Sequence, residues 1–134
     1  MSLNDIFGIS SSAMSAQSLR LNTTASNMAN INSQAGSPEE AYRARAPVFQ
    51  TLLTQHGGAG VGVAGMTQSN APVEQRYEPN NPLADEQGYV YGSNVNPVEE
   101  MVNMKSASRN YQTNVEIMDT TKQLAMRTLQ LGQQ

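Results

Sequence analysis

The stretch NPVEEMVNMKSASRNYQTNVEIMDTTKQLAMRTLQLG, residues 96–132, decides the fold. Asn96 is a preferred residue for capping a helix N-terminus, and Pro97 suits the first helical position. Glu99 and Glu100 then place carboxylates in the first turn, where the helix dipole favours negative charge. Neither proline nor glycine follows until Gly132, which permits about 35 helical residues, or roughly 50 Å. We therefore expect one long helix over residues 97–134.

A seven-residue apolar repeat marks both ends of the chain. The C-terminal rows are Met104, Tyr111, Met118 and Ala125, followed by Ile117, Leu124 and Leu131, and the N-terminal row is Phe7, Met14, Leu21 and Met28. Such a repeat keeps one seam of a helix facing a partner helix over many turns. The two ends are therefore expected to be helices with an exposed apolar seam that pair in a coiled coil. Such ends favour a protein that assembles with other chains.

The N-terminal helix is expected over roughly residues 2–32. Ser2 is a plausible N-cap, and Asp5 follows it three residues later. The segment from Asn30 to Pro38 is rich in turn-forming residues and ends the helix. Polar residues flank the apolar row, so this helix is expected to be marginal in isolation.

The middle of the chain is punctuated by glycine and proline. Residues 73–77 alternate in the manner of a strand, and Tyr89-Val90-Tyr91 lies between two glycines. Residues 48–52 and 61–63 suggest shorter extended pieces. The expected fold is mainly α with a small, irregular β insert (α+β): helices in 1–35 and 97–134 form a coiled-coil inner domain, and 36–96 form the insert.

Composition excludes several classes of function. The net charge is -3, so a basic surface for nucleic acid is not expected. No stretch is apolar enough to span a membrane, and the N-terminus lacks the features of a cleavable secretory signal. The chain has no cysteine, which excludes disulfides and thiolate metal sites.

The candidate chemical motifs are weak. Residues 60–65 read G-x-G-x-x-G with Asp85 twenty residues further on, but no helix is expected after them to meet a pyrophosphate. We interpret these glycines as a flexible loop. His56 is the only histidine and is expected to be a loop residue.

Four carboxylates of the middle region are expected to be solvated, and we predict no catalytic, cofactor-binding or metal-binding residue. These carboxylates belong to Glu74, Glu78, Asp85 and Glu86.

The residues Ser26-Asn27-Met28-Ala29-Asn30-Ile31-Asn32-Ser33 resemble the signature near the N-terminus of bacterial flagellar rod and hook proteins. Further stretches, at residues 42–50, 77–96 and 100–114 and at the closing Leu129-Gln130-Leu131-Gly132, make the chain similar to the proximal rod members of that family. The resemblance covers nearly the whole chain. One departure is Gly92-Ser93 before Asn94, where the family usually has proline, which predicts a looser approach to the last helix.

The resemblance implies a structural subunit of the proximal rod that transmits torque across the periplasm and has no active site. It also implies export through the flagellar type III channel without a cleaved signal peptide. The implied partners are other rod proteins, the adaptor that joins the rod to the inner-membrane ring, and further copies of the chain. A soluble coiled-coil adaptor that binds one partner protein is the alternative, and it would be fully helical on its own.

The apolar rows and the asparagines of the signature supply the candidate assembly interface. Its residues are Phe7, Met14, Leu21, Asn27, Met28, Asn30, Met104, Tyr111, Met118, Leu124 and Leu131.

Overall fold

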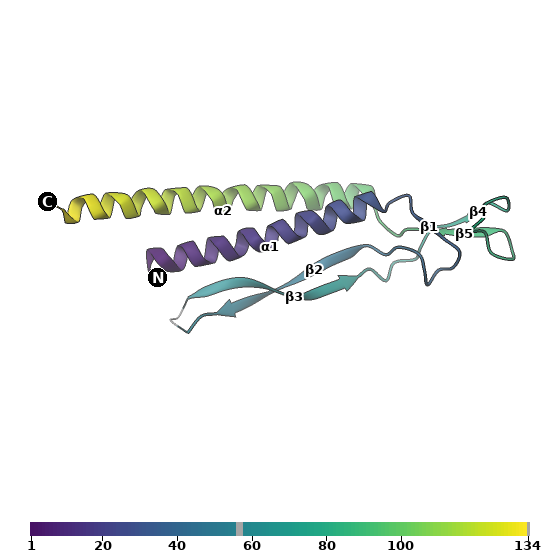
Figure 1. Cartoon of the computed structure of the whole chain (residues 1–134), viewed down its shortest axis with the longest axis horizontal. Helices are drawn as coiled ribbons and strands as arrows, with labels where there is room; N and C mark the ends of the chain where they lie inside the picture. Colours follow the sequence, from purple (N-terminus) through teal and green to yellow (C-terminus); the bar gives the residue numbers. More distant parts are fainter. Residues whose placement is uncertain (56–57, 134) are drawn as a thin grey trace.

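The computed structural model describes residues 1–55 and 58–133, so His56 lies outside the described residues. Two long helices enclose five strands in the sequence (Figure 1). In chain order the elements are α1 (Leu3–Ala29), β1 (Gln34–Ala35), β2 (Arg45–Leu53), β3 (Ala59–Gln68), β4 (Gln75–Tyr77), β5 (Tyr89–Gly92) and α2 (Pro97–Gly132). The expectation of two terminal helices with β structure between them is confirmed.

The helices α1 and α2 lie side by side and antiparallel, with both chain ends at the same end of the molecule (Figure 1). Both predicted N-caps form. Ser2 and Asp5 exchange hydrogen bonds in a capping box, and the Asn96 side chain accepts from the backbone N–H of Val98 at 3.0 Å. The helix α2 is longer than α1 and continues past the N-terminus of α1, so its last turns have no helix beside them.

The predicted apolar rows of both helices are half-buried. These residues are Phe7, Met14, Leu21 and Met28 of α1, with Met104, Tyr111, Met118 and Ala125 of α2. The fully buried apolar side chains are small, and they include Ala16 of α1 and Ala107 of α2. The two helices therefore pack closely around small residues. The larger apolar side chains of the two rows stay partly exposed to solvent in the single chain.

A long antiparallel hairpin, β2–β3, lies along α1 (Figure 1). Its pairing runs from Arg45 opposite Gln68 to Leu53 opposite Ala59, with one irregularity at Val48 and Phe49. The extended pieces predicted at residues 48–52 and 61–63 lie within β2 and β3, and both strands are longer than predicted. The flexible glycine loop predicted for residues 60–65 is wrong, because these residues belong to β3.

The glycines of β3 allow the strand to approach its neighbours closely. The Ser12 hydroxyl of α1 accepts a hydrogen bond from the Val61 N–H at 3.0 Å. A Cβ atom at Gly60 would lie 3.1 Å from the Ser12 Oγ, and one at Gly62 would lie 2.6 Å from the Leu52 Cδ1. Contact with α1 and with β2 thus accounts for glycine here, without a phosphate.

Gly60→Ala and Gly62→Ala are expected to have modest effects and no nucleotide-linked phenotype. The Leu52 side chain is exposed and can rotate away from a new methyl group, whereas Ser12 must shift by a few tenths of an ångström. We expect a loss of about 1 kcal/mol or less for each substitution. Calorimetric titration with NAD and ATP should give no saturable binding to either the parent chain or the double variant; micromolar binding that the double variant loses would contradict this interpretation.

A second, three-stranded sheet, ordered β1-β5-β4, lies at the end of the helix pair away from the chain termini (Figure 1). The predicted strands at 73–77 and 89–91 correspond to β4 and β5. The loop between them turns at Gly88, whose φ of 86° favours glycine. The Asp85 carboxylate accepts from the Tyr89 N–H and from the Tyr91 hydroxyl, each at 2.9 Å, and these bonds hold the pKa of Asp85 below its usual value. Asp85 therefore fixes this loop.

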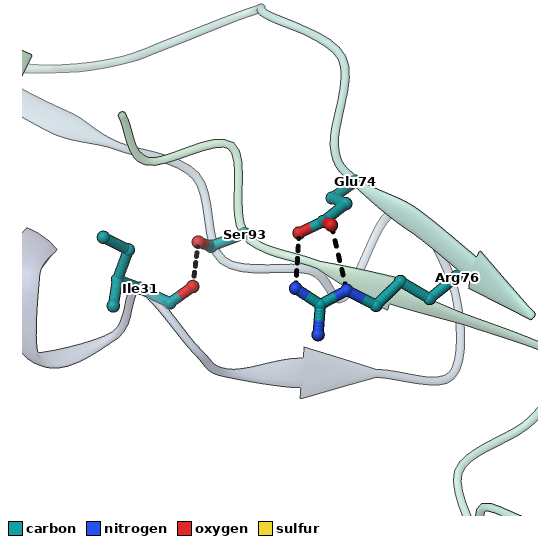
Figure 2. A network of polar contacts seen from close by, with 4 residues as sticks. All are labelled: Ile31, Glu74, Arg76 and Ser93. Carbon is teal, nitrogen blue, oxygen red and sulfur yellow. Dashed lines mark hydrogen bonds and ion pairs between the residues drawn. The ribbon is translucent and has the colours of Figure 1, made fainter. Parts of the chain in front are cut away.

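A polar contact ties the approach to α2 onto the end of α1 (Figure 2). The Ser93 hydroxyl is buried and donates to the Ile31 carbonyl at 2.8 Å. Ser93 thus supplies a hydrogen bond that proline could not make, and the looser approach predicted from Gly92-Ser93 stays a prediction. The nearby Glu74–Arg76 pair (Figure 2) is bidentate but about half exposed, so it contributes little to stability.

Candidate functional site

Asn27 is the centre of a buried polar cluster that joins α1, β2 and α2. Its side-chain NH₂ donates to the Arg45 carbonyl at 2.8 Å and to the Glu100 carboxylate at 3.0 Å. Its side-chain oxygen accepts from the Tyr42 hydroxyl at 2.9 Å and from the Arg45 N–H at 3.0 Å. All four hydrogen-bonding positions of the amide are occupied, and the residue is only 1% exposed.

Glu100 is a buried carboxylate in the first turn of α2, only 6% exposed. Burial raises its pKa, and the neighbouring Glu99 adds to the shift, while the hydrogen bond from Asn27 opposes it. In the described part of the chain no cationic side chain forms an ion pair with Glu100. The two arginines that line the same cleft as Glu100 have other contacts: Arg20 donates to the Asn103 side chain at 2.9 Å, and the Arg45 guanidinium lies over the Tyr42 ring.

Glu100→Gln is expected to stabilise the helix pair near pH 7. The pKa of Glu100 is raised on folding, so its contribution to stability is fully present below the unfolded pKa and is lost as the pH rises through the folded pKa. Glutamine keeps the oxygen that accepts from Asn27 and removes the charge. Far-UV circular dichroism of the purified chain should show helicity falling as the pH rises above the ordinary glutamate pKa of about 4.3, with a smaller fall in the variant.

Glu116→Gln is the matched control, because Glu116 is exposed on the same helix and does not contribute to the raised pKa of Glu100. If Glu116→Gln and Glu100→Gln weaken the pH dependence of helicity equally, the buried carboxylate is not its source.

The predicted interface residues other than Asn27 fall into three groups. The two apolar rows are half-buried, and Met14, Tyr111 and Met118 line one hollow between the helices. Asn30 caps α1, where its amide donates to the Ser26 carbonyl at 2.9 Å. Leu124 and Leu131 lie on α2 away from α1, 49% and 72% exposed.

Asn27 has no hydrogen-bonding position left for a neighbouring chain. The sequence did not single out its partners Tyr42, Arg45 and Glu100 as interface residues, because their meeting depends on the tertiary fold.

Large apolar side chains lie exposed along both α2 and the hairpin. On α2 they include Val98, Met101, Val102, Val115, Ile117, Met126 and Leu129, and on the hairpin Val48, Leu52, Leu53, Val63 and Met66. Soluble monomers seldom expose so many large apolar side chains together, so this surface resembles an interface whose partner is absent.

The structure offers no constellation for chemistry in the residues that it describes. No group of three His, Asp or Glu side chains in residues 1–55 and 58–133 could hold a metal ion. A cleft of about 650 Å³ between the helix pair and the hairpin is lined by both polar and apolar groups, including Arg20, Phe49 and Glu99, and Glu100 on its wall already bonds to Asn27.

Neither helix, over the residues described, is apolar enough along its length to cross a membrane.

Comparison with known families matches both ends of the chain. Residues 8–34 match the family described as flagella basal body rod protein, and residues 86–131 match the flagellar basal body rod FlgEFG protein C-terminal family. These segments contain most of α1, and β5 with nearly all of α2. The fold and these matches define the class, the flagellar basal-body rod proteins.

Full-length relatives identify the family within that class. The chain is 49% identical over 134 residues to the flagellar basal-body rod protein FlgC of Salmonella typhimurium, covering 99% of this chain and 100% of the relative. The FlgC proteins of Yersinia enterocolitica and of Buchnera aphidicola from Acyrthosiphon pisum are 52% and 40% identical at the same coverage. The chain belongs to the FlgC family. It is a structural rod protein of the flagellar basal body and not an enzyme.

Proposed function

We propose that the chain is a subunit of the proximal rod that transmits torque across the periplasm. In this proposal it assembles with further copies of itself, with other rod proteins and with the adaptor to the inner-membrane ring. The observation that carries the proposal is the large apolar surface that one copy leaves open.

The exposed area supports assembly quantitatively. The chain has an accessible surface of 9184 Å² for a mass of 14.5 kDa. A compact monomer of this mass would expose about 6,900 Å², so the surplus is about 2,300 Å² per chain. Stable interfaces bury about 800 Å² on each partner. The surplus therefore suffices for contacts with two or three neighbours.

We further propose that residues 1–35 and 97–134 act as one coiled-coil inner domain, with residues 36–96 as an insert. The half-buried seam between α1 and α2 supports the pairing. The hairpin of the insert lies against α1, so it would move with the inner domain. Asn27 contributes to assembly by fixing α2 and the hairpin to α1, not by contacting a neighbour.

In this proposal the subunit reaches the periplasmic rod through the flagellar export channel with its N-terminus intact. The similarity to flagellar basal-body rod proteins supports this route. Mass spectrometry of the subunit from isolated basal bodies should find residues 1–5 present. An N-terminus created by cleavage further along the chain would contradict the route.

The function is tested by deleting the gene and restoring it. Deletion should abolish swimming, and electron microscopy should show basal bodies without a complete rod; the parent gene should restore both. Normal rods in the deletion strain would refute the proposal. A purified chain that is fully helical, melts cooperatively and binds one protein outside the rod would favour the adaptor.

A further inference from the structure

One apolar row of α2 has no partner within the chain. Ile117, Leu124 and Leu131 repeat at seven-residue spacing and are 42%, 49% and 72% exposed. At about 100° per residue, this row lies about 100° around α2 from Met118, which faces α1 in the seam. We call these three residues the knob row.

The opposite flank of the helix pair carries a groove. Two adjoining hollows of about 420 and 300 Å³ share Met14 of α1 and Met118 of α2. Ser11, Ser15 and Ser18 of α1 line the first hollow. The second is lined by the apolar Phe7 and Val115, with the charged Asp119 and Lys122 at its α2 side. Val115 lies about 60° from Met118 in the direction away from the knob row. We call the two hollows together the seam groove.

The seam groove has the shape and chemistry to receive a row of apolar side chains. Its floor contains the half-buried Met14, Tyr111 and Met118, and methionine adapts its shape to a packing partner. The three serines on its α1 side are exposed and small, so a neighbouring helix can approach closely. Because the knob row and the groove lie on opposite flanks of one helix pair, a chain cannot fill its own groove.

We propose that the knob row of one copy docks into the seam groove of a second copy. This inference rests on the proposed function and adds which surfaces meet. The contact joins two different patches, so each subunit uses one patch toward each of two neighbours, and the array closes as a ring or continues as a helix.

The accessible surface area of the chain is large enough for a second copy to occupy the seam groove. Two interfaces of about 800 Å² each would use about 1,600 Å² of each subunit, which fits within the surplus of about 2,300 Å². The remainder leaves surface for other rod proteins.

Cysteine cross-linking between two variants tests the contact, because the parent chain has no cysteine. Cells that lack the chromosomal gene would express two alleles together, one with Leu124→Cys and the other with Ser11→Cys, Ser15→Cys or Ser18→Cys. Oxidised basal bodies would then be separated on non-reducing gels. With one cysteine on each chain, any disulfide must join two copies. Ile117→Cys serves as a second donor if Leu124→Cys prevents swimming.

Gln123→Cys is the matched control for Leu124→Cys, since it is exposed in the same turn but points about 100° away. We expect Leu124→Cys to give a disulfide-linked product of twice the subunit mass with at least one of the three serine-position variants. Gln123→Cys should give at least tenfold less of this product.

Three results would overturn the inference. The first is the absence of a cross-link with both Leu124→Cys and Ile117→Cys in cells that swim, which would leave the proposed function intact. A disulfide that forms efficiently between two Leu124→Cys chains would indicate a symmetric contact instead. A photo-reactive maleimide attached at position 124 that captures only another rod protein would assign the knob row to that protein. Failure of the proposed function is separate: it would appear as normal rods in the deletion strain.

Discussion

Asn27→Ala should prevent rod assembly and abolish swimming while leaving the chain expressed. Truncation leaves the Tyr42 hydroxyl, the Arg45 N–H and the buried Glu100 carboxylate without their Asn27 partner. A buried polar group left unsatisfied costs about 1–3 kcal/mol, so we expect a loss of roughly 3 kcal/mol or more. That loss is a large share of the 5–15 kcal/mol of a typical domain.

Asn30→Ala is the matched control, because Asn30 lies one helical turn away and its amide makes one local bond, to the Ser26 carbonyl. A single hydrogen bond of this kind contributes about 1 kcal/mol, and we expect the Asn30 variant to swim. Asn27→Asp should behave like Asn27→Ala, since the carboxylate cannot donate to Glu100 and adds a second charge beside it. Swimming and counts of complete rods would be compared among the three strains. Normal rods with Asn27→Ala would show that the cluster is dispensable.

The helices could be predicted from the sequence because their signals are local. Ser2, Asp5 and Asn96 cap helices through residues no more than three positions away, and the apolar rows repeat within each helix. The cluster at Asn27 could not be predicted in this way. Its partners lie 15, 18 and 73 positions away in the sequence, and only the fold brings them together.

The hairpin was predicted only in part, as short extended pieces at residues 48–52 and 61–63, and its full length could not be predicted for a different reason. The residues of β3 combine glycine with small apolar side chains, so they lack the polar and apolar alternation that marks a half-buried strand. Most of β2 is exposed and carries apolar side chains on both faces. Glycine weakens a strand in general, but here it permits the approach to Ser12 and Leu52. A tertiary contact therefore outweighs the local preference.

The apolar rows predict which side chains need partners but not whether the partner belongs to the same chain. Met118 and Leu124 look alike in the sequence, as members of neighbouring rows. In the structure Met118 is half-buried in the seam with α1, whereas Leu124 is 49% exposed. The difference comes from their positions around α2, because Leu124 lies about 120° around the helix from Met118 and so points away from the face that packs on α1.

Leu124→Asp should leave the single chain intact and abolish its incorporation into the rod. In one chain the new carboxylate stays hydrated, because position 124 is about half exposed, so expression and helicity should change little. In the assembly the same position would be covered. Each subunit then loses roughly 1.5–3 kcal/mol of leucine burial and must also dehydrate a charge. Leu131→Asp is expected to act in the same direction.

The control is Gln123→Asp, which adds the same charge in the same turn on the outer face of α2. Cells that carry it should swim, whereas cells with Leu124→Asp should lack complete rods although the subunit is present in whole-cell blots. If the two variants are equally impaired, added charge on α2 is the cause. If both strains swim, the knob row is not covered in the rod. A folding defect would lower the amount of protein, and an effect of charge would appear at both positions. A defect confined to Leu124→Asp, with normal amounts of protein, therefore indicates a leucine that is half exposed in the single chain and buried between subunits.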